Sequence, residues 1–491
     1  MLEFKGRDNM TKSNIGMVGL AVMGSNLARN MANHGFKVSC WNYTRDLTDQ
    51  FFSGAAKDNE NLVAYYDLKE FVDSLEKPRR IFMMIMAGKP VDSMIDSLIP
   101  LLDKGDVIVD GGNSHYPDTI RRSKYCEEKG INYVGCGVSG GEEGALHGPS
   151  LMPGGSKEAW DSLKTILQTI CAHTENNEPC CDHVGEDGAG HFVKMVHNGI
   201  EYGDMELICE AYNFMKNALG LTNEELREVF EDWNKGELNS YLIEITSKIL
   251  GYKDENGEYV IDTILDKAGQ KGTGKWTAIE ALDEGIPLTL IGDAVFARCL
   301  SSIKEQRVKA AKTFNKTVNK YSGDKKEVIE NIRKALYVCK IISYAQGYEL
   351  LSNAAKVHNW SLNYGGIALM WRGGCIIRSQ FLGKIKEAYD KNPNLDNLLL
   401  DDYFKDIVER YIPSLREVIK VAVDSKVAMS SFFAALSYFD GYTSESLPAN
   451  LLQAQRDYFG AHTYEVKGKE GHFHTNWTGE GGDISSTTYN V

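Results

Sequence analysis

The sequence has no apolar run long enough to cross a membrane, which takes about 18 or more consecutive apolar residues. Its first ten residues, MLEFKGRDNM, also lack the apolar segment of a secretory signal. The ten cysteines are scattered and none is spaced CxxC, which makes a poor framework for disulfides. His472 and His474 alone are too few ligands for a metal ion. These absences predict a cytoplasmic protein with no membrane segment and no metal.

Positive charge is also in short supply. Lysine and arginine number 54 against 68 aspartates and glutamates, which gives a formal net charge of −14. No Lys/Arg-rich block interrupts this acidity, and the charge would repel a phosphate backbone, so nucleic acid is not an expected partner. A small anion can still bind where a few basic side chains gather against the overall field.

The order of apolar patterns predicts the fold class. From Ile15 to about Val184, helical patterns alternate with the short runs NIGMVGL, KVSCWN, RIFMMIM, DVIVDGG and NYVGCGVSG. Alternating strands and helices indicate a parallel sheet covered by helices. After about Gly188 the period becomes 3.6 residues, and we expect helices over 224–250 and 326–357. The prediction is an α/β Rossmann-like dinucleotide-binding domain followed by a large all-α domain.

The C-terminal composition defines a further region. From about Leu447 the chain is rich in Gly, Thr, Ser, His and Tyr, so it cannot bury a core of its own. We expect this short tail to dock on another surface or to stay disordered. The predicted domains are a flexible extension over 1–14, the Rossmann-like domain over 15–187, the helical domain over 188–446 and the tail over 447–491.

Residues 15–35, IGMVGLAVMGSNLARNMANHG, read as a strand, a glycine turn and a helix. Gly19, Ala21 and Gly24 occupy the positions of G-x-G-x-x-G, although the Ala21 methyl crowds the turn slightly. The glycines permit a tight turn, and the helix N-terminus offers free N–H groups to a pyrophosphate. We therefore predict that the whole turn binds a dinucleotide, with the residues Gly19, Leu20, Ala21, Val22, Met23 and Gly24.

The end of the second predicted strand lacks the acidic residue that usually binds the ribose hydroxyls of NAD. Neutral Asn42 stands there, followed by Tyr43, Thr44 and Arg45, with Asp46 next in the chain. A 2′-phosphate is not repelled by this stretch. NADP is therefore the favoured cofactor, and NAD remains open.

The stretch 269–277, GQKGTGKWT, lacks the hydroxyl residue of a Walker A phosphate loop. Trp276 stands where Ser or Thr would bind magnesium, and the preceding residues look helical instead of extended. An NTPase site is therefore not expected. A glycine-rich loop with Lys271 and Lys275 is still suited to an anion, and the alternative is a solvated basic turn.

The stretch 194-KMVHNGIEYGD-204 places polar groups within apolar sequence. On a helix, Lys194, His197, Asn198 and Glu201 share one stripe about 100° wide. Burial would lower the pKa of a lysine and raise that of a glutamate, making a base and an acid. The alternative is an exposed polar stripe. Because this helix begins where the nucleotide domain ends, we favour a catalytic pair in an alcohol dehydrogenase with a second, proton-dependent step.

Several long motifs resemble one family throughout the chain from about Ile15 onward. They are GLAVMG, DGGNSHYPDT, GVSGGEEGALHGPSLMPGG, KMVHNGIEYGDM, KGTGKW, FARC and QAQRDYFGAHTYE. They resemble the decarboxylating 6-phosphogluconate dehydrogenases. The resemblance implies NADP-dependent oxidation of 6-phosphogluconate at C3, loss of CO2 and formation of ribulose 5-phosphate without a metal. It implies Lys194 as the general base and acid, and Glu201 as the acid that protonates C1.

The same resemblance implies the substrate site. Ser139, Gly140 and Gly141 would hold the carboxylate end, His197 and Asn198 the hydroxyls, and Asn113 would lie near both substrate and nicotinamide. The phosphate end would consist of Tyr202, Lys271, Arg298, Arg456 and His462. In the family the tail threads through a neighbouring subunit. Arg456 and His462 would therefore serve the partner's site in a homodimer.

Two positions depart from the family pattern. Tyr43 stands where an arginine usually contacts the 2′-phosphate, and Met86 stands where many relatives have lysine. Met86 and Ala87 are both expected to contact the cofactor. NADP preference is therefore expected to be weaker, or NAD to be accepted. Two other functions stay open: a β-hydroxyacid dehydrogenase acting on a smaller substrate, and a non-catalytic NADP-binding protein.

Overall fold

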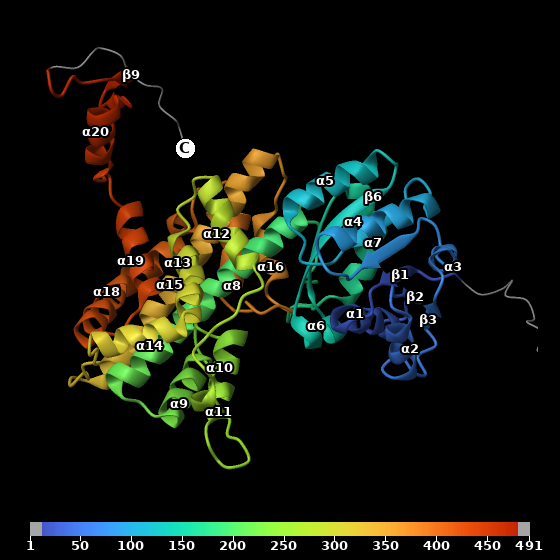
Figure 1. The fold of residues 1–491 in the computed structure, drawn as a ribbon, viewed down its shortest axis with the longest axis horizontal. Helices are drawn as coiled ribbons and strands as arrows, with labels where there is room; N and C mark the ends of the chain where they lie inside the picture. The colour runs from blue at the N-terminus through green and yellow to red at the C-terminus, as the bar shows by residue number, and fades with distance from the viewer. Residues whose placement is uncertain (1–11, 480–491) are drawn as a thin grey trace, which may run out of the picture.

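A computed structural model describes residues 12–479 of the chain. Figure 1 shows an α/β part at one side, a larger helical part beside it, and the α20 region standing away from the helical part. The predicted extension falls largely on residues 1–11, outside the described residues, as do residues 480–491 of the predicted tail. Ser13 and Asn14 already belong to the fold, because their N–H groups donate to the carbonyls of Ser74 and Lys37.

In the described part of the N-terminal region, seven strands form one sheet in the order β3-β2-β1-β4-β5-β6-β7. The strands are β1 (Ile15–Val18), β2 (Val38–Trp41), β3 (Leu62–Tyr65), β4 (Arg80–Met83), β5 (Val107–Asp110), β6 (Asn132–Ser139) and β7 (Ser150–Gly154). Residues of β1, β2 and β5 are buried throughout, which suits strands covered on both faces. This explains their near-continuous apolar sequences.

The parallel sheet predicted from the sequence is confirmed from β1 to β6, but β7 pairs antiparallel with β6. The sequence of β7, SLMPG, did not indicate a strand because proline is tolerated only where no ladder hydrogen bond is needed, as at the edge of a sheet. Strand β3 was also missed. Its residues Val63–Tyr65 are only partly buried, so its pattern is weak.

Helices cover the two faces of the sheet. They are α1 (Val22–Asn33), α2 (Arg45–Ser53), α3 (Leu68–Asp73), α4 (Lys89–Leu98), η1 (Ile99–Leu101), α5 (Tyr116–Glu127), α6 (Gly141–His147) and α7 (Lys157–Ile170). One buried cluster includes Leu27, Val109 and Leu163, and another on different side chains includes Phe71, Ile81 and Ile95. The two clusters fill the layers between sheet and helices.

The second region is helical throughout its main body. Its elements are α8 (Ala189–Phe214), the π-helix η2 (Met215–Leu219), α9 (Asn223–Trp233), α10 (Tyr241–Gly251), α11 (Val260–Thr263), α12 (Thr273–Asp283), α13 (Thr289–Ser302), α14 (Lys304–Thr313), α15 (Lys325–His358), α16 (Tyr364–Met370), α17 (Leu382–Lys391), η3 (Leu398–Leu400), α18 (Asp402–Ser425) and α19 (Ser430–Tyr442). The predicted helix over 326–357 is confirmed as α15. The helix predicted over 224–250 is two helices, because Ser240 caps a new N-terminus at α10.

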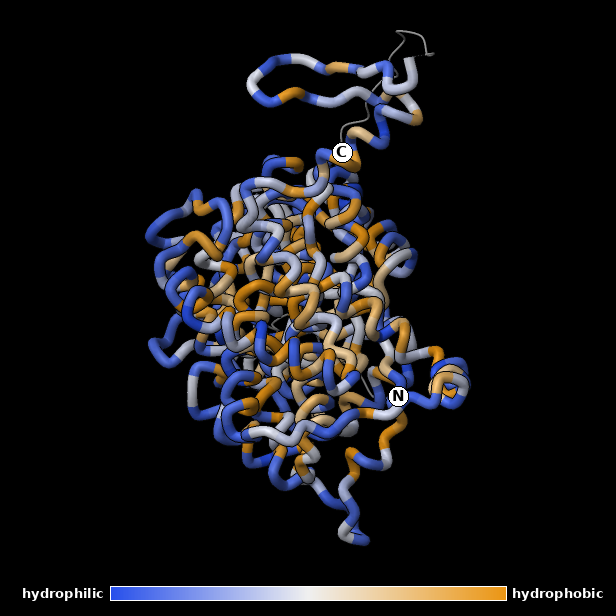
Figure 2. The backbone as a smooth tube through the Cα atoms, turned by 90° about the vertical axis from the view of Figure 1, so that its left-hand side faces the viewer, coloured by the Kyte–Doolittle hydropathy of each residue, from blue (hydrophilic) through white to orange (hydrophobic). Residues whose placement is uncertain are grey.

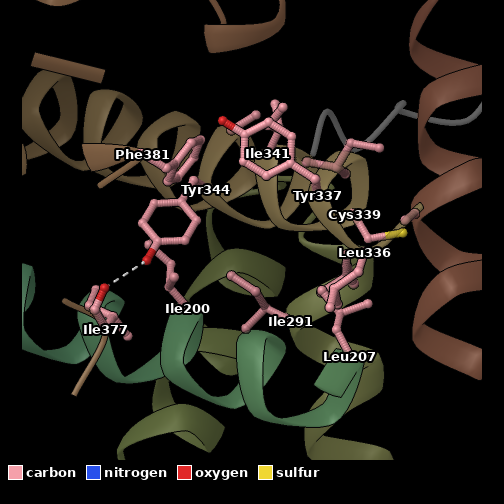
Figure 3. Close-up of a cluster of buried hydrophobic side chains, with 14 of the residues drawn as sticks. Ile200, Leu207, Ile291, Leu336, Tyr337, Cys339, Ile341, Tyr344, Ile377 and Phe381 are labelled. Carbon is pink, nitrogen blue, oxygen red and sulfur yellow. Dashed lines mark hydrogen bonds between the residues drawn. The ribbon is translucent and has the colours of Figure 1, made fainter. Parts of the chain in front are cut away.

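Helix α15 forms the centre of the helical core. Figure 3 shows side chains of α15, such as Leu336 and Tyr344, meeting Ile200 and Leu207 of α8 and Ile291 of α13. Between the same two helices a buried ion pair joins Lys340 Nζ to Asp204 Oδ2 at 2.5 Å. Helix α8 is thereby held on one side by the helical core.

The other side of α8 packs against strands β6 and β7. A Cβ added at Gly137 of β6 would lie 2.4 Å from Lys194 Cβ, so only glycine permits this approach of strand and helix. Helix α8 is therefore the element that joins the two regions. Its polar stripe lies at their junction.

The described part of the chain ends in a small separate unit made of α20 (Ala449–Gly460), β8 (Tyr464–Val466) and β9 (Lys469–Phe473). Strands β8 and β9 form an antiparallel hairpin. Figures 1 and 2 show this unit projecting from the rest of the protein, and the hairpin is mainly hydrophilic. The described part of the predicted tail is thus ordered by its own local contacts.

Candidate functional site

A large cavity opens where the carboxyl ends of β1, β2 and β4 meet. Strand β1 lies between β2 and β4, so the chain winds outward in both directions from this point. Such a switch point is where open α/β sheets bind nucleotides. The cavity has a volume of about 860 Å³. Of the residues predicted to bind the cofactor, those lining it are Gly19, Ala21, Asn42, Tyr43, Thr44 and Met86.

The glycine turn has the geometry that the motif predicts. Gly19 has φ +96°, and a Cβ at Gly24 would lie only 1.9 Å from Gly19 O, so α1 can pack here only with glycine. Gly24, Arg45 and Asn113 do not line the cavity, and neither do four other predicted residues. Leu20 is buried, Val22 is exposed on α1, Met23 packs on the core and Ala87 lies beside Met86.

The edge of the cavity after β2 carries no fixed positive charge toward it. Asn42 Oδ1 accepts the N–H of Leu20 at 3.0 Å, so its amide braces the glycine turn. The side chain of Tyr43 is 90% exposed. The Arg45 guanidinium stacks on the ring of Tyr66 at 4.5 Å and is not among the lining residues. An adenosine with or without a 2′-phosphate therefore meets neutral groups first.

The motif reasoning missed an apolar wall on the far side of this cavity. Leu68, Ile85, Pro90 and Met94 line it, with Ser93 and Ser97 beside them. Ser93, Met94 and Ser97 share one face of α4 at helical spacing. A usable signal was the strand RIFM followed by a Gly-Lys-Pro helix start, because β4 neighbours β1 in this fold type.

The polar stripe of α8 is buried, as the catalytic hypothesis requires. Lys194 Nζ donates to Asn198 Oδ1 at 2.8 Å and lies 3.3 Å from His197 Nδ1. His197 Nδ1 lies 3.9 Å from Glu201 Oε2. His197 is fully buried, Lys194 is 7% exposed and the Glu201 side chain is 21% exposed. The four side chains therefore form one connected group, contrary to an exposed stripe.

Burial shifts the proton affinities in the directions that catalysis needs. Desolvation lowers the pKa of Lys194, against the smaller opposing effect of Glu201. Desolvation also raises the pKa of Glu201, opposed by Lys194 and Arg298. The pKa of His197 is lowered well below its usual value by burial and by Lys194. Burial thus shifts Lys194 and His197 toward their neutral forms and Glu201 toward its protonated form.

Two further partners hold this stripe in place. Asn198 Nδ2 donates to Thr273 Oγ1 at 2.7 Å, and Ser139 Oγ lies 3.5 Å from His197 Nε2. Thr273 lies within the KGTGKW motif, from which the sequence pattern singled out only Lys271 and Lys275. Thr273 is the first residue of α12, and its hydroxyl orients the Asn198 amide by accepting its hydrogen bond.

The loops at the carboxyl ends of β5 and β6 face the same junction. Ser139 ends β6, and Gly140 and Gly141 follow with φ +120° and +63°. Asn113 is exposed after β5, in a loop fixed by Asp110. The carboxylate of Asp110 accepts from Gly112 N and from Ser114 Oγ. Asp110 is thus a structural residue of the site that sequence reasoning passed over.

Basic residues gather beyond Glu201 on the same side of α8. The Arg298 guanidinium lies 3.5 Å from the centre of the Tyr202 ring, and its Nη1 donates to Gly269 O at 3.3 Å. Lys271 is exposed in the same loop, and its charge reaches Glu201. The structure therefore brings Tyr202, Lys271 and Arg298 to one end of the stripe.

The structure does not bring Arg456 and His462 to the α8 site of their own chain. Both lie in the projecting α20 unit, apart from α8 (Figure 1). Within residues 12–479, no group of three or more His, Cys, Asp or Glu is arranged to hold a metal ion. In the same residues no helix is long and apolar enough to span a membrane.

The sequence matches known protein families over almost its whole length. Residues 14–185 match the family described as the NAD binding domain of 6-phosphogluconate dehydrogenase. Residues 190–477 match its C-terminal domain. The decarboxylating 6-phosphogluconate dehydrogenase of Homo sapiens is 59% identical over 484 residues, 98% of this chain and 100% of that protein. The enzyme of Aggregatibacter actinomycetemcomitans is 58% identical over 482 residues, 98% of this chain and 99% of that protein.

A solved structure agrees with these matches. Plasmodium falciparum 6-phosphogluconate dehydrogenase, studied with its cofactor NADP+ and its substrate 6-phosphogluconate, superimposes with a TM-score of 0.92 at 47% identity. The match covers 94% of this chain and 100% of that one. The dinucleotide-binding sheet and the buried stripe of α8 thus define an oxidoreductase of the nicotinamide-dependent class. More specifically, the chain belongs to the decarboxylating 6-phosphogluconate dehydrogenase family.

Proposed function

We propose that this protein oxidises 6-phosphogluconate and decarboxylates it to ribulose 5-phosphate and CO2, with NADP as the hydride acceptor. The observation that supports this most directly is the buried group of Lys194, His197, Asn198 and Glu201 at the junction with the nucleotide domain. A metal is not needed, because a β-keto acid loses CO2 when a proton donor stabilises the developing enolate.

Lys194 is the general base and then the general acid. Its lowered pKa favours the neutral amine, whose Nζ can accept the proton of the C3 hydroxyl during oxidation. The resulting ammonium then donates to the C3 carbonyl oxygen while CO2 leaves. Asn198, 2.8 Å away, orients Nζ, and Thr273 orients Asn198.

Glu201 is the acid that completes the reaction. Its raised pKa favours the protonated carboxyl, which can protonate C1 of the enol formed after CO2 departs. His197 lies between the two groups and stays neutral, which suits hydrogen bonding to a substrate hydroxyl without adding charge. Both proton transfers then come from one helix face.

The residues around the β1–β2–β4 crevice fit a dinucleotide. The turn at Gly19 and Gly24 leaves room for a pyrophosphate at the start of α1, and the apolar wall containing Met94 and Leu68 suits an adenine. A nicotinamide cofactor held there would supply the hydride acceptor. Asn113 is the proposed contact shared by substrate and nicotinamide. Thr44 is a proposed contact of a 2′-phosphate, and so is Arg45 once its guanidinium leaves the ring of Tyr66.

The carboxylate of the substrate is proposed to lie against Ser139, Gly140 and Gly141, and its phosphate against Tyr202, Lys271 and Arg298. Arginine suits phosphate because its planar fork donates two parallel hydrogen bonds. This local cluster offsets the overall acidity of the chain. The proposed nucleotide domain is 15–187, the proposed substrate and dimerisation domain is 188–446, and the tail is 447–491.

Arg456 and His462 are proposed to complete the phosphate site of a second subunit. Apolar side chains support a dimer, because they are exposed both on α13 and on α20. They are Phe296 and Leu300 on α13, and Leu451, Leu452 and Phe459 on α20. Burying such side chains between two chains is favourable by roughly 25 cal/mol per Å² of apolar surface. The tail would then dock on the partner.

The test is the initial rate of NADP reduction, and separately of NAD reduction, with 6-phosphogluconate while CO2 release is followed. We expect reduction and CO2 release in equal amounts, with kcat/KM higher for NADP than for NAD. A folded dimer that reduces neither cofactor would refute the proposal. Activity only on a smaller, unphosphorylated β-hydroxyacid would favour that other class of dehydrogenase.

A further inference from the structure

The loop that carries His462 has an unfavourable backbone on both sides of that residue. Ala461 has φ +49° and Thr463 has φ +59°. Residues with a Cβ rarely adopt positive φ, and β-branched threonine does so at the greatest cost. Contacts from elsewhere must therefore hold this turn.

Two side chains of α20, Gln453 and Asp457, form a clamp that holds both backbone polar groups of Thr463. Asp457 Oδ1 accepts the Thr463 N–H at 3.0 Å, and Gln453 Nε2 donates to Thr463 O at 2.6 Å. Thr463 is 7% exposed, so these groups replace water for it. Gln453 and Asp457 lie four residues apart on one face of α20. The strained turn is thereby fixed to the helix.

The same two side chains lie beside Arg456. Gln453 Oε1 accepts from Arg456 Nη1 at 3.1 Å while its Nε2 holds Thr463. One amide therefore connects the arginine with the residue that follows His462. The relative position of Arg456 and His462 depends on this amide.

Asp457 also binds the segment that follows β9 of the hairpin. It is fully buried, and its carboxylate accepts from His474 Nδ1 at 2.9 Å, Thr475 N at 3.0 Å and Trp477 Nε1 at 2.8 Å. Burial acts to raise the pKa of Asp457, but these hydrogen bonds outweigh burial and lower the pKa to about 2. The carboxylate thus stays ionised over the physiological pH range.

We infer that Gln453 and Asp457 are positioning residues, which hold Arg456 and His462 as a preformed pair for the substrate phosphate in the partner's site. The inference rests on the proposed function, in which the tail serves a second subunit. The tail unit stands away from its own chain, so nothing in that chain's α8 site orders it (Figure 1). A pair that is already ordered loses less conformational entropy when it meets phosphate.

Two variants test the clamp, and both spare Arg456 and His462. Asp457→Asn keeps the shape of the side chain. It replaces one acceptor oxygen by an amide N–H that faces the donors now bound by the carboxylate, so those hydrogen bonds are lost. Gln453→Met removes both hydrogen bonds of the amide and adds no charge beside Arg456. The control is Glu465→Gln, which removes one negative charge, as Asp457→Asn does, at an exposed position of β8. Each protein is measured as the full-length dimer, with kcat and the KM values for 6-phosphogluconate and NADP determined separately.

We expect each clamp variant to raise the KM for 6-phosphogluconate about tenfold, as expected when two phosphate-binding side chains must be ordered on binding. The KM for NADP should stay within about twofold, because the cofactor crevice is remote from the tail. The Glu465→Gln control should match the parent protein in all constants. A shift in both KM values, or in dimer content by sedimentation for both variants, would indicate a general folding defect and overturn the inference.

A mixed dimer shows whether the effect acts in trans. Co-expressed chains carrying Lys194→Met and Asp457→Asn, purified by two different tags, contain one site with an intact Lys194 that receives the intact tail. That dimer should regain the parental KM for 6-phosphogluconate at up to half the parental kcat. A mixed dimer that keeps the raised KM would overturn the inference.

The clamp and the phosphate role of the tail can be refuted separately. If Arg456→Ala raises the KM but neither clamp variant does, the inference is refuted and the proposed phosphate role of the tail stands. If Arg456→Ala and His462→Ala both leave the KM unchanged, the tail has no part in phosphate binding and both statements fall.

Discussion

The stripe on α8 and the tail unit around Asp457 hold their polar groups in opposite ways. On α8, Lys194 and His197 are buried between the sheet and the helical core of one chain. In the tail, the turn carrying His462 is organised by Asp457, outside the body of its own chain (Figure 1). Proton transfer needs pKa values shifted by desolvation, which one folded chain supplies. Phosphate capture needs charged side chains that can stay hydrated until a second chain arrives.

The largest effect on activity is expected in the buried stripe of α8. Lys194→Met keeps an unbranched side chain of similar length but removes the base, so turnover should fall at least about 1000-fold. NADP binding measured by fluorescence titration should not change. Lys164→Met, on the exposed face of α7, is the control and should retain full activity. Turnover near the parental rate in Lys194→Met would refute the assignment of the base.

Glu201→Gln should lower kcat about 100-fold, because the amide cannot protonate C1 of the enol. The substrate KM should change much less, since the side chain stays similar in shape. Stopped-flow measurement should show CO2 and NADPH formed faster than ribulose 5-phosphate. Glu228→Gln on exposed α9 is the matched control. Equal rates for all three products at the parental level would remove Glu201 as the acid.

The pH profile of kcat/KM follows from the two shifted groups. The lowered pKa of Lys194 keeps the neutral amine available toward lower pH, and activity is lost on the acid side when it protonates. The raised pKa of Glu201 keeps the acid available toward higher pH, and activity is lost on the alkaline side when it ionises. The profile should be bell-shaped, with apparent values that belong to the coupled pair. In Glu201→Gln the alkaline limb should disappear while the acid limb remains.

At the tail, the effect should be on binding instead of chemistry. Arg456→Ala should raise the KM for 6-phosphogluconate about tenfold or more, because a charge-assisted contact to phosphate is lost. The kcat should fall by a smaller factor, and added salt should weaken substrate binding less than in the parent. Lys467→Ala, which removes an equal charge from the exposed hairpin turn, is the control. A loss of kcat at constant KM would contradict the contrast between the two regions.

The smallest effect is expected at the cofactor edge. Tyr43→Arg adds a positive charge beside the crevice, and the ratio of kcat/KM for NADP over NAD should rise about tenfold or less. Tyr43→Phe tests whether the hydroxyl matters and should leave the ratio nearly unchanged. An unchanged ratio in Tyr43→Arg would mean that other residues set the preference for the 2′-phosphate.

Much of the fold was predictable because its signals are local. The glycine turn at Gly19, the predominantly parallel sheet and the helix α15 each follow from short-range spacing. The antiparallel strand β7 and the break between α9 and α10 did not follow, because each depends on an edge position or a cap instead of periodicity. The apolar wall containing Met94 was missed for a related reason. Its residues have no motif and meet only through the sheet order.

By itself, the sequence determined which residues of α8 share a face, because helical spacing is a property of the backbone alone. It also determined that Asn42, Tyr43 and Thr44 after β2 are uncharged, since folding cannot add a charge that the side chains lack. Only the tertiary structure decided that Lys194 is buried, that Thr273 holds Asn198, and that the tail forms a unit around Asp457. Burial and contact between distant segments arise from packing, and packing is what shifts a pKa or orders a loop.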